Sequence, residues 1–203
     1  VGASELNVSG NGTTSQFLRS DGDGTMTWAE PTSVGIISVQ DFTSSGTSTW
    51  SRPSGCTKVH VHVVGGGGGA YSGAGGSNGS PGGHGGSTEE VIDVSGVSSV
   101  TVTVGAGGAS PEHTAASAGG TSSFGSYCSA TGGGAGASTV GAGDASNGAN
   151  GSGSNGQINR SGNIHGPLFG TGGASISDWP TQVTTTGVLG SAGKPGYVYI
   201  VNY

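Results

Sequence analysis

Residues 59–69 read VHVHVVGGGGG, a strand pattern that runs directly into a glycine tract. Val59, Val61 and Val63 occupy every second position, which predicts a half-buried β-strand because successive side chains of a strand point to opposite faces. The tract from Gly65 to Gly69 has neither the β-branched residues of a strand nor the helix formers of a helix. The stretch therefore joins two kinds of structure, and both recur along the chain.

Further strand patterns lie on either side of this stretch. Valine alternates with threonine in Val100–Val104, and a β-branched and aromatic run, Tyr197–Val201, closes the chain. Shorter extended stretches are expected at Ser38–Phe42, Thr47–Trp50, Glu90–Val94 and Thr121–Tyr127. Apolar residues nowhere recur at helical spacing over a dozen positions. We therefore predict an all-β fold with little or no α-helix, in which strands build a sandwich-like head.

Glycine supplies 47 of the 203 residues, too many for an ordinary apolar core. One tract carries Gly73, Gly76, Gly79, Gly82 and Gly85 at every third position, which matches the three residues per turn of a polyproline-II helix. Collagen has the same period but needs abundant proline, and this tract holds only Pro81. We predict polyglycine-II helices, which pack side by side and bond to each other through their backbones. In this arrangement these glycines face a neighbouring backbone and Ser80 faces outward, whereas flexible linkers are the alternative.

Composition excludes several classes of partner. Lys and Arg together number 5, so no basic patch is available for nucleic acid or an anionic membrane surface. No apolar run approaches the ~20 residues that a membrane span needs, so membrane insertion is not expected. Cys56 and Cys128 could form at most one disulfide, and the interpretation we favour is two reduced thiols.

The chain divides into two parts. Residues 1–33 are polar and rich in turns, and they hold two short extended stretches, Gln16–Arg19 and Thr25–Trp28. Pro31, Thr32 and Ser33 mark a joint, after which residues 34–203 carry the strand patterns and glycine tracts. We predict a connector segment followed by a glycine-rich distal domain.

The order of these motifs resembles the glycine-rich domain of bacteriophage tail-fibre proteins. The residues that carry the resemblance are Phe42-Thr43, Gly46 to Trp50, Pro53-Ser54-Gly55, Val59 to Gly69, Val94-Ser95-Gly96, Val100 to Gly108, Gly119 to Gly125 and Gly193 to Tyr203. The stretch from Leu6 to Trp28 is similar to a connector found upstream of phage fibre heads, those of cyanophages included. The resemblance implies a homotrimer in the tail fibre of the virion, assembled in the host cytoplasm beside other fibre proteins. It also implies a distal head that binds a bacterial surface glycan or an outer-membrane protein.

No catalytic motif is recognisable. Glycoside hydrolysis needs two carboxylates about 5 to 10 Å apart, and no motif places any pair among Glu89, Glu90, Asp93, Glu112, Asp144 and Asp178. A nucleophile elbow or a P-loop needs a helix after its glycine-rich turn, and no helix is expected. We therefore expect a protein that is not an enzyme.

His60 and His62 are the one metal-ligand pattern in the sequence. Residues two apart on a strand project from the same face. If this strand lay near a three-fold axis, three copies would bring six imidazoles together, enough for an octahedral transition-metal site. The resemblance implies iron, because phage fibre tips with a His-x-His motif bind it. The alternative is that both side chains face solvent or a neighbouring layer, and no other cofactor is expected.

Aromatic and imidazole groups in polar surroundings are candidates for receptor binding, because such rings stack on sugars and anchor interfaces. These candidates are Tyr71, His84, His113, Tyr127, His165, Phe169 and Trp179. Two other functions stay open. The first is a purely structural fibre protein of the virion. The second is an ice-binding protein, which needs a repeated row of small or threonine side chains that the loops after Ala109 do not supply.

Overall fold

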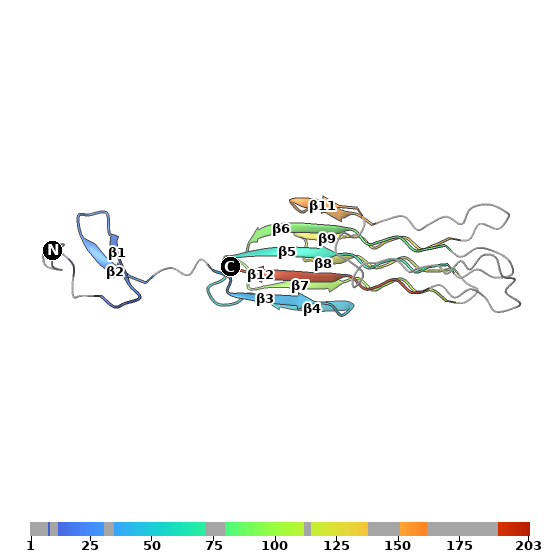
Figure 1. Ribbon diagram of the computed structural model, residues 1–203, viewed down its shortest axis with the longest axis horizontal. Coiled ribbons are helices and arrows are strands. Elements are labelled where there is room, and N and C mark those ends of the chain that lie inside the picture. Colours follow the sequence, from blue (N-terminus) through green and yellow to red (C-terminus); the bar gives the residue numbers. More distant parts are fainter. Residues whose placement is uncertain are drawn as a thin grey trace, which may run out of the picture. The chain divides into compact units, whose positions relative to one another are not determined.

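The computed structural model describes residues 8, 12–30, 35–71, 80–111, 115–137, 151–161 and 191–203. Every regular element in this part of the chain is a β-strand, which confirms the predicted all-β class (Figure 1). The chain forms two compact units, Val1–Gly35 and Ile36–Tyr203. Their division falls next to the joint expected at residues 31–33.

The first unit holds one antiparallel hairpin, made by β1 (Phe17–Ser20) and β2 (Met26–Ala29). Its turn contains Gly22 and Gly24, both at positive φ. Asp23 orders the turn, since its Oδ1 accepts hydrogen bonds from Thr25 Oγ1 at 2.6 Å and from Thr25 N at 2.9 Å. These bonds favour the carboxylate and lower the pKa of Asp23.

The second unit contains two five-stranded antiparallel sheets. The sheet that we name the β8 sheet has the order β10-β9-β8-β7-β4, and the β5 sheet has the order β11-β6-β5-β12-β3. The strands of the β8 sheet are β4 (Gly46–Ser51), β7 (Ser99–Val104), β8 (Ser122–Phe124), β9 (Cys128–Ala130) and β10 (Gly153–Ser154). Those of the β5 sheet are β3 (Ser38–Phe42), β5 (Lys58–Val64), β6 (Ser87–Asp93), β11 (Ile158–Arg160) and β12 (Tyr197–Asn202).

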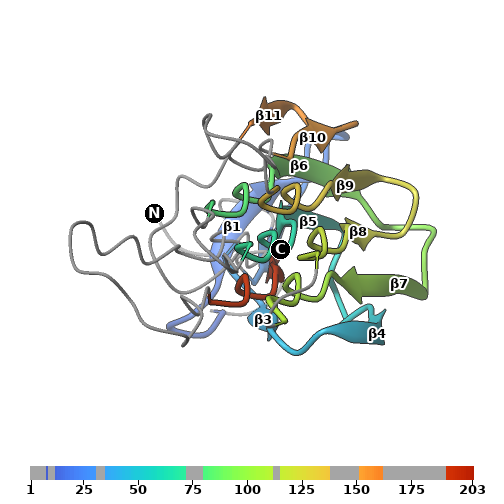
Figure 2. The same ribbon diagram turned by 90° about the vertical axis from the view of Figure 1, so that its right-hand side faces the viewer.

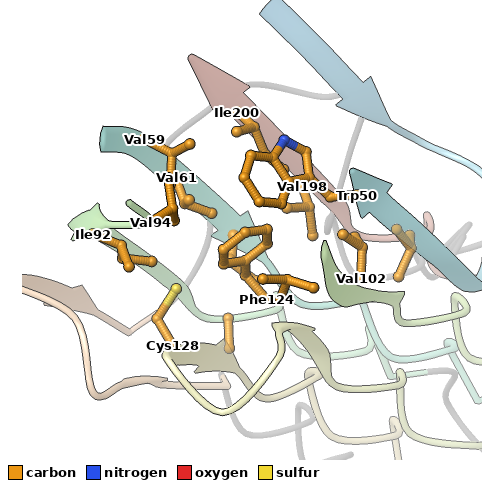
Figure 3. Close-up of a cluster of buried hydrophobic side chains, with 14 of the residues drawn as sticks. Trp50, Val59, Val61, Ile92, Val94, Val102, Phe124, Cys128, Val198 and Ile200 are labelled. Atoms are coloured by element: carbon orange, nitrogen blue, oxygen red, sulfur yellow. The ribbon is translucent and has the colours of Figure 1, made fainter. Parts of the chain in front are cut away.

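The two sheets enclose one apolar core (Figure 3). Val59, Val61 and Val63 are fully buried in it, as their period of two predicts. Trp50 and Phe124 pack edge to face, with ring centroids 5.6 Å apart. Trp50 Nε1 donates to Asn202 Oδ1 at 3.0 Å, so the polar atom of the largest core side chain has a partner.

Six strands continue into, or begin from, glycine-rich segments that run side by side and form what we call the bundle (Figure 1). The described bundle segments are 65–71, 80–86, 105–111, 115–121, 131–137 and 191–196. Figure 2 looks onto their far end and shows segment 65–71 in the middle, with the other segments around it.

The backbone amides of segment 65–71 donate to three neighbours in strict rotation. Gly65, Gly68 and Tyr71 donate to segment 80–86, each at 2.9 Å. The amides one residue further on, Gly66 and Gly69, donate to segment 115–121, and the next ones, Gly67 and Ala70, donate to segment 191–196. Each neighbour is thus met at every third residue, which is the pattern of a three-fold extended helix. This confirms the predicted polyglycine-II arrangement and excludes a flexible linker for this segment.

Glycine is required where these helices touch. A Cβ on Gly82 would overlap the carbonyl oxygen of Gly68, and a Cβ on Gly85 would overlap that of Gly65. The prediction that this glycine series faces a backbone is therefore confirmed at these two positions, whereas Gly73, Gly76 and Gly79 lie outside the described residues.

The predicted outward position of Ser80 is wrong. Ser80 is fully buried, and its Oγ donates to the carbonyl oxygen of Ala137 at 2.8 Å. The period of three indicates only the side on which the glycines meet a neighbouring segment. A segment inside the bundle, however, has neighbours on several sides. A side chain two residues before Gly82 therefore points to segment 131–137 rather than to solvent.

Both cysteines are buried and unpaired, as expected. Burial raises the pKa of the Cys128 thiol to about 11, and Glu90 adds to the shift. The protonated thiol behaves here as a small apolar core side chain.

Candidate functional site

The far end of the bundle is the candidate site, because the ends of five bundle segments meet there. Tyr71 N donates to Ser80 O at 2.9 Å, and Ser80 Oγ donates to Ala137 O. Ser110 Oγ donates to Ala70 O at 2.6 Å, while Ala70 N donates to Ser191 O at 3.1 Å. In the sequence, residues 72–79 connect Tyr71 to Ser80, residues 138–150 follow Ala137, and residues 162–190 precede Ser191.

The scaffold beneath this end is rigid. Segment 65–71 donates a backbone hydrogen bond from every residue, and its glycines Gly65, Gly66, Gly68 and Gly69 leave no room for a side chain. A network of this kind fixes the positions from which the connecting stretches start. Variable stretches held by a fixed framework are a common way to build a recognition surface.

Only some of the predicted receptor-binding residues can be placed relative to this end. Tyr71 lies at it and is half-buried, whereas His84 is exposed on the side of segment 80–86, where its carbonyl oxygen accepts from Gly151 N. Tyr127 lies in the turn between β8 and β9, at the opposite end of the sandwich, with its ring 5.9 Å from that of Phe124. The remaining candidates, His113, His165, Phe169 and Trp179, lie outside the described residues.

His60 and His62 project from the outer face of β5, because Val59, Val61 and Val63 face the core. His60 Nε2 lies 3.5 Å from Glu89 Oε2, and His62 Nδ1 lies 2.8 Å from the hydroxyl of Tyr197. Burial raises the pKa of that tyrosine to about 12, with a further contribution from Glu89. In the described part of the chain, no group of three or more His, Cys, Asp or Glu side chains could hold a metal ion. A full site would therefore need ligands beyond the described residues of one chain, and the metal site stays a prediction.

Sequence reasoning missed a feature of the β8 sheet, whose outer face carries only hydroxyl side chains in the rows that strand pairing defines. One row crosses all five strands and consists of Ser154, Ser129, Ser123, Thr103 and Thr47. Thr101 pairs with Thr49, and Ser99 pairs with Ser51. The alternation in Val100–Val104 already places its threonines on the face opposite the valines. Only the register between strands, however, shows that hydroxyl side chains of different strands lie in one row.

The comparisons with known proteins agree with the glycine-rich character of the second unit. A family model described as a glycine-rich domain matches residues 43–201, from the turn before β4 into β12. No curated protein sequence matches the chain. In the described residues, no helix is long and apolar enough to cross a membrane.

Proposed function

The chain belongs to the glycine-rich domain family, and we propose that it is the distal head of a bacteriophage tail fibre. In this proposal it is a homotrimeric, non-enzymatic adhesin of the virion, assembled in the host cytoplasm together with other fibre proteins. Its receptor is a bacterial surface glycan or an outer-membrane protein, which it binds during adsorption. Neither nucleic acid nor membrane insertion is part of this function.

The observation that carries the proposal is the end of the bundle. Tyr71, Ser80, Ala137, Ser110 and Ser191 meet there through direct hydrogen bonds or through the adjacent Ala70. This end presents the starts of several connecting stretches on a framework whose backbone is held by hydrogen bonds at successive residues. A receptor-binding head needs such a fixed base, from which the stretches that contact the receptor start. The order of strand and glycine motifs, which resembles the order in tail-fibre proteins, supports the same proposal.

The proposal is tested by binding to intact cells. Fluorescently labelled protein is mixed with a panel of bacterial strains, and bound protein is measured by flow cytometry. Binding to some strains and not to others is expected. Periodate treatment of the cells abolishes binding if the receptor is a glycan, whereas protease treatment abolishes it if the receptor is a protein.

Two variants locate the binding surface on the protein. Tyr71→Ala changes the bundle end, while Tyr127→Ala changes an aromatic residue at the opposite end of the sandwich. We expect Tyr71→Ala to weaken binding and Tyr127→Ala to leave it unchanged. If the folded protein binds no strain of a broad panel, the receptor-binding role is contradicted and the purely structural fibre role is favoured.

A metal bound by His60 and His62 belongs to the trimer proposal, because this pair supplies two imidazoles from each chain and three copies supply six. Elemental analysis of the purified trimer would show about one iron or other transition-metal ion per three chains. His60→Gln together with His62→Gln would remove that metal. A trimer that contains no transition metal would contradict this part of the proposal.

The hydroxyl row of the β8 sheet gives the ice-binding alternative one supporting observation. Neighbouring residues of this row lie ~4.8 Å apart across the strands, and residues two apart on one strand lie ~6.7 Å apart. The hydroxyl groups of this face are therefore regularly spaced. The outer face of a sandwich is normally polar, however, and serine and threonine suit it without any ligand. Thermal hysteresis of a concentrated solution decides between the two: its absence removes the ice-binding function.

A further inference from the structure

The two outer faces of the sandwich differ in chemistry. The outer face of the β8 sheet carries serine and threonine in the rows described above. The outer face of the β5 sheet instead carries valine, isoleucine, tyrosine and histidine together with charged residues. Because both sheets pack on the same core, the core does not explain why their outer faces differ.

Strand pairing shows how the apolar residues of the β5 sheet are arranged. One row across four strands consists of Val91, His60, Val201 and Val39. The next row crosses all five strands and consists of Ile158, Glu89, His62, Tyr199 and Asp41. Side chains directly opposite each other in a sheet lie on the same face and touch. The apolar side chains therefore lie on one face in two groups, Val91 with Ile158 on one flank and Val39, Val201 and Tyr199 on the other. His60, Glu89 and His62 lie between the two groups.

Several of these apolar side chains are exposed in the single chain. Val39 is 47% exposed, Val91 46% and Ile158 43%, and Tyr199 is 38% exposed. Isolated exposed apolar residues are ordinary, whereas several exposed apolar residues on one face of a sheet point to an interaction surface. This face therefore needs a partner that covers it.

We propose that the outer face of the β5 sheet is the surface through which three copies of this chain associate. This inference rests on the homotrimer in the proposed function and names the surface that makes it. β5 is the middle strand of its sheet, so in this trimer it lies closest to the three-fold axis. The flanks β11 and β3 of neighbouring copies then meet around the outside.

The width of the sheet fits this arrangement. Five strands ~4.8 Å apart span roughly 19 Å, and a triangle with sides of that length has its centre about 5.5 Å from each side. Packed sheets lie about 10 Å apart, which leaves roughly 5 Å of side chain for each sheet. Three β5 sheets that face inward would therefore fill the space around the axis with their own side chains and leave no channel.

The charges at the two flanks are complementary. Arg160 lies on β11 at one edge of the sheet, and Asp41 lies on β3 at the other. A three-fold arrangement brings the β11 edge of one copy to the β3 edge of the next. Arg160 already contacts Glu89, with Nη1 and Oε1 3.7 Å apart. A guanidinium has five N–H donors, so it can bind Asp41 of the neighbouring copy as well.

The outer face of the β8 sheet offers matched controls. Val91→Asp places a carboxylate in the apolar row, and Thr101→Asp places one at an exposed position of the opposite face. Light scattering coupled to size-exclusion chromatography measures the mass of each variant. The wild type and Thr101→Asp should have three times the chain mass of 19.2 kDa, and Val91→Asp should have the mass of one chain. Circular dichroism should show the same strand content in all three proteins.

Cysteine pairs give a second test that tolerates a weakened fold. Asp41→Cys and Ile158→Cys in one chain place thiols at the same row on opposite edges of the β5 sheet, whereas Cys56 and Cys128 are buried. Mild oxidation should link three copies into one covalent species on a non-reducing gel. The control pair, Thr47→Cys with Ser154→Cys, occupies opposite edges of the hydroxyl row and should stay unlinked.

The outcomes separate this inference from the proposed function. If the Val91→Asp variant is still a trimer and only the control cysteine pair links the copies, the assigned surface is wrong, but the trimer itself is supported. A wild type that is a monomer or a dimer overturns the three-fold association, while binding to cells can still support the adhesin. If Val91→Asp dissociates the trimer but the wild-type trimer binds no cells, the adhesin function is contradicted and the assigned trimer surface is supported.

Discussion

The sandwich and the bundle of the second unit are stabilised by different parts of the same chain. The sandwich buries side chains such as Trp50, Phe124 and Val61, and its strands bond to one another in the usual ladders. The bundle has almost no side chains between its segments, and Gly65 to Tyr71 donate a backbone hydrogen bond from each successive residue. Glycine content therefore does not by itself indicate disorder: it indicates disorder only when the backbone groups have no partner.

The two regions should also respond differently to mutation. A core side chain of the sandwich can be made smaller at the cost of a cavity. A bundle glycine cannot be made larger, because the atom that it meets is the backbone of a neighbouring segment. The largest loss of stability on substitution is therefore expected in the bundle.

Gly68→Val should destabilise the protein most. A Cβ at this position overlaps the carbonyl oxygen of Gly134, and the amide of Gly68 would lose its bond to Gly83 O. Overpacking and unsatisfied buried backbone groups together should cost on the order of 5 kcal/mol, which is comparable with the whole stability of many domains. The control is Ala106→Val, at an exposed bundle position. Chemical denaturation of both variants measures the difference, and equal effects would contradict close backbone packing in the bundle.

Phe124→Ala should cost about 4 kcal/mol, because it leaves a cavity beside Trp50 in the sandwich core. Tyr127→Ala, in the same turn region but 37% exposed, is the matched control and should cost far less. Urea unfolding followed by tryptophan fluorescence reports both free energies. A cost for Phe124→Ala below about 1 kcal/mol would show that this core is not well packed.

Asn202→Ala should cost about 2 kcal/mol, because it removes the acceptor of the buried Trp50 Nε1–H and the donor to Ser38 O. Asn202→Leu keeps a similar volume without the acceptor or the donor, so comparison with the alanine variant distinguishes the lost hydrogen bonds from lost volume. If the buried bond matters, the near-ultraviolet circular dichroism of Trp50 should change in the alanine variant. Unchanged stability in the alanine variant would mean that water replaces the asparagine.

The smallest effect is expected at Asp93, the exposed last residue of β6. Its Oδ1 accepts hydrogen bonds from Ser95 Oγ at 2.6 Å and from Ser95 N at 2.9 Å, and these lower its pKa below 3.8. Because the folded state binds the proton less tightly than the unfolded state, this contribution is fully present above pH 3.8 and is lost as the pH falls through the lowered value. Melting temperatures between pH 5 and pH 2.5 should therefore fall slightly less for Asp93→Asn than for the wild type. Parallel pH profiles would contradict a role for this carboxylate.

The strands that the sequence predicted share a clear local signal. Val59, Val61 and Val63 alternate with polar residues, and Ser38–Phe42 was expected with the bounds that β3 has. β9, β10 and β11 were not predicted, because strands of two or three residues are too short to show a period of two. Such strands form because neighbouring strands supply the pairing, which is long-range information.

The candidate site likewise depends on long-range contacts that local sequence patterns do not specify. The glycine period predicted three-fold helices, but only the folded chain shows that segment 65–71 is surrounded by other segments, so Ser80 is buried instead of exposed. Tyr71 and Tyr127 are equally plausible as aromatic residues in polar stretches, yet they lie at opposite ends of the unit. The apolar and hydroxyl faces of the sandwich likewise depend on register between strands, which no local pattern specifies.

Amide hydrogen exchange at Gly65 to Gly69, measured by NMR on the isotope-labelled protein, tests most directly whether the bundle is held by its backbone. Slow exchange is expected at all of these consecutive glycines, comparable with the amides of β5, because each of them donates to a neighbouring segment. Exchange of these glycine amides at the rate of an unstructured peptide, next to protected amides in β5, would contradict it.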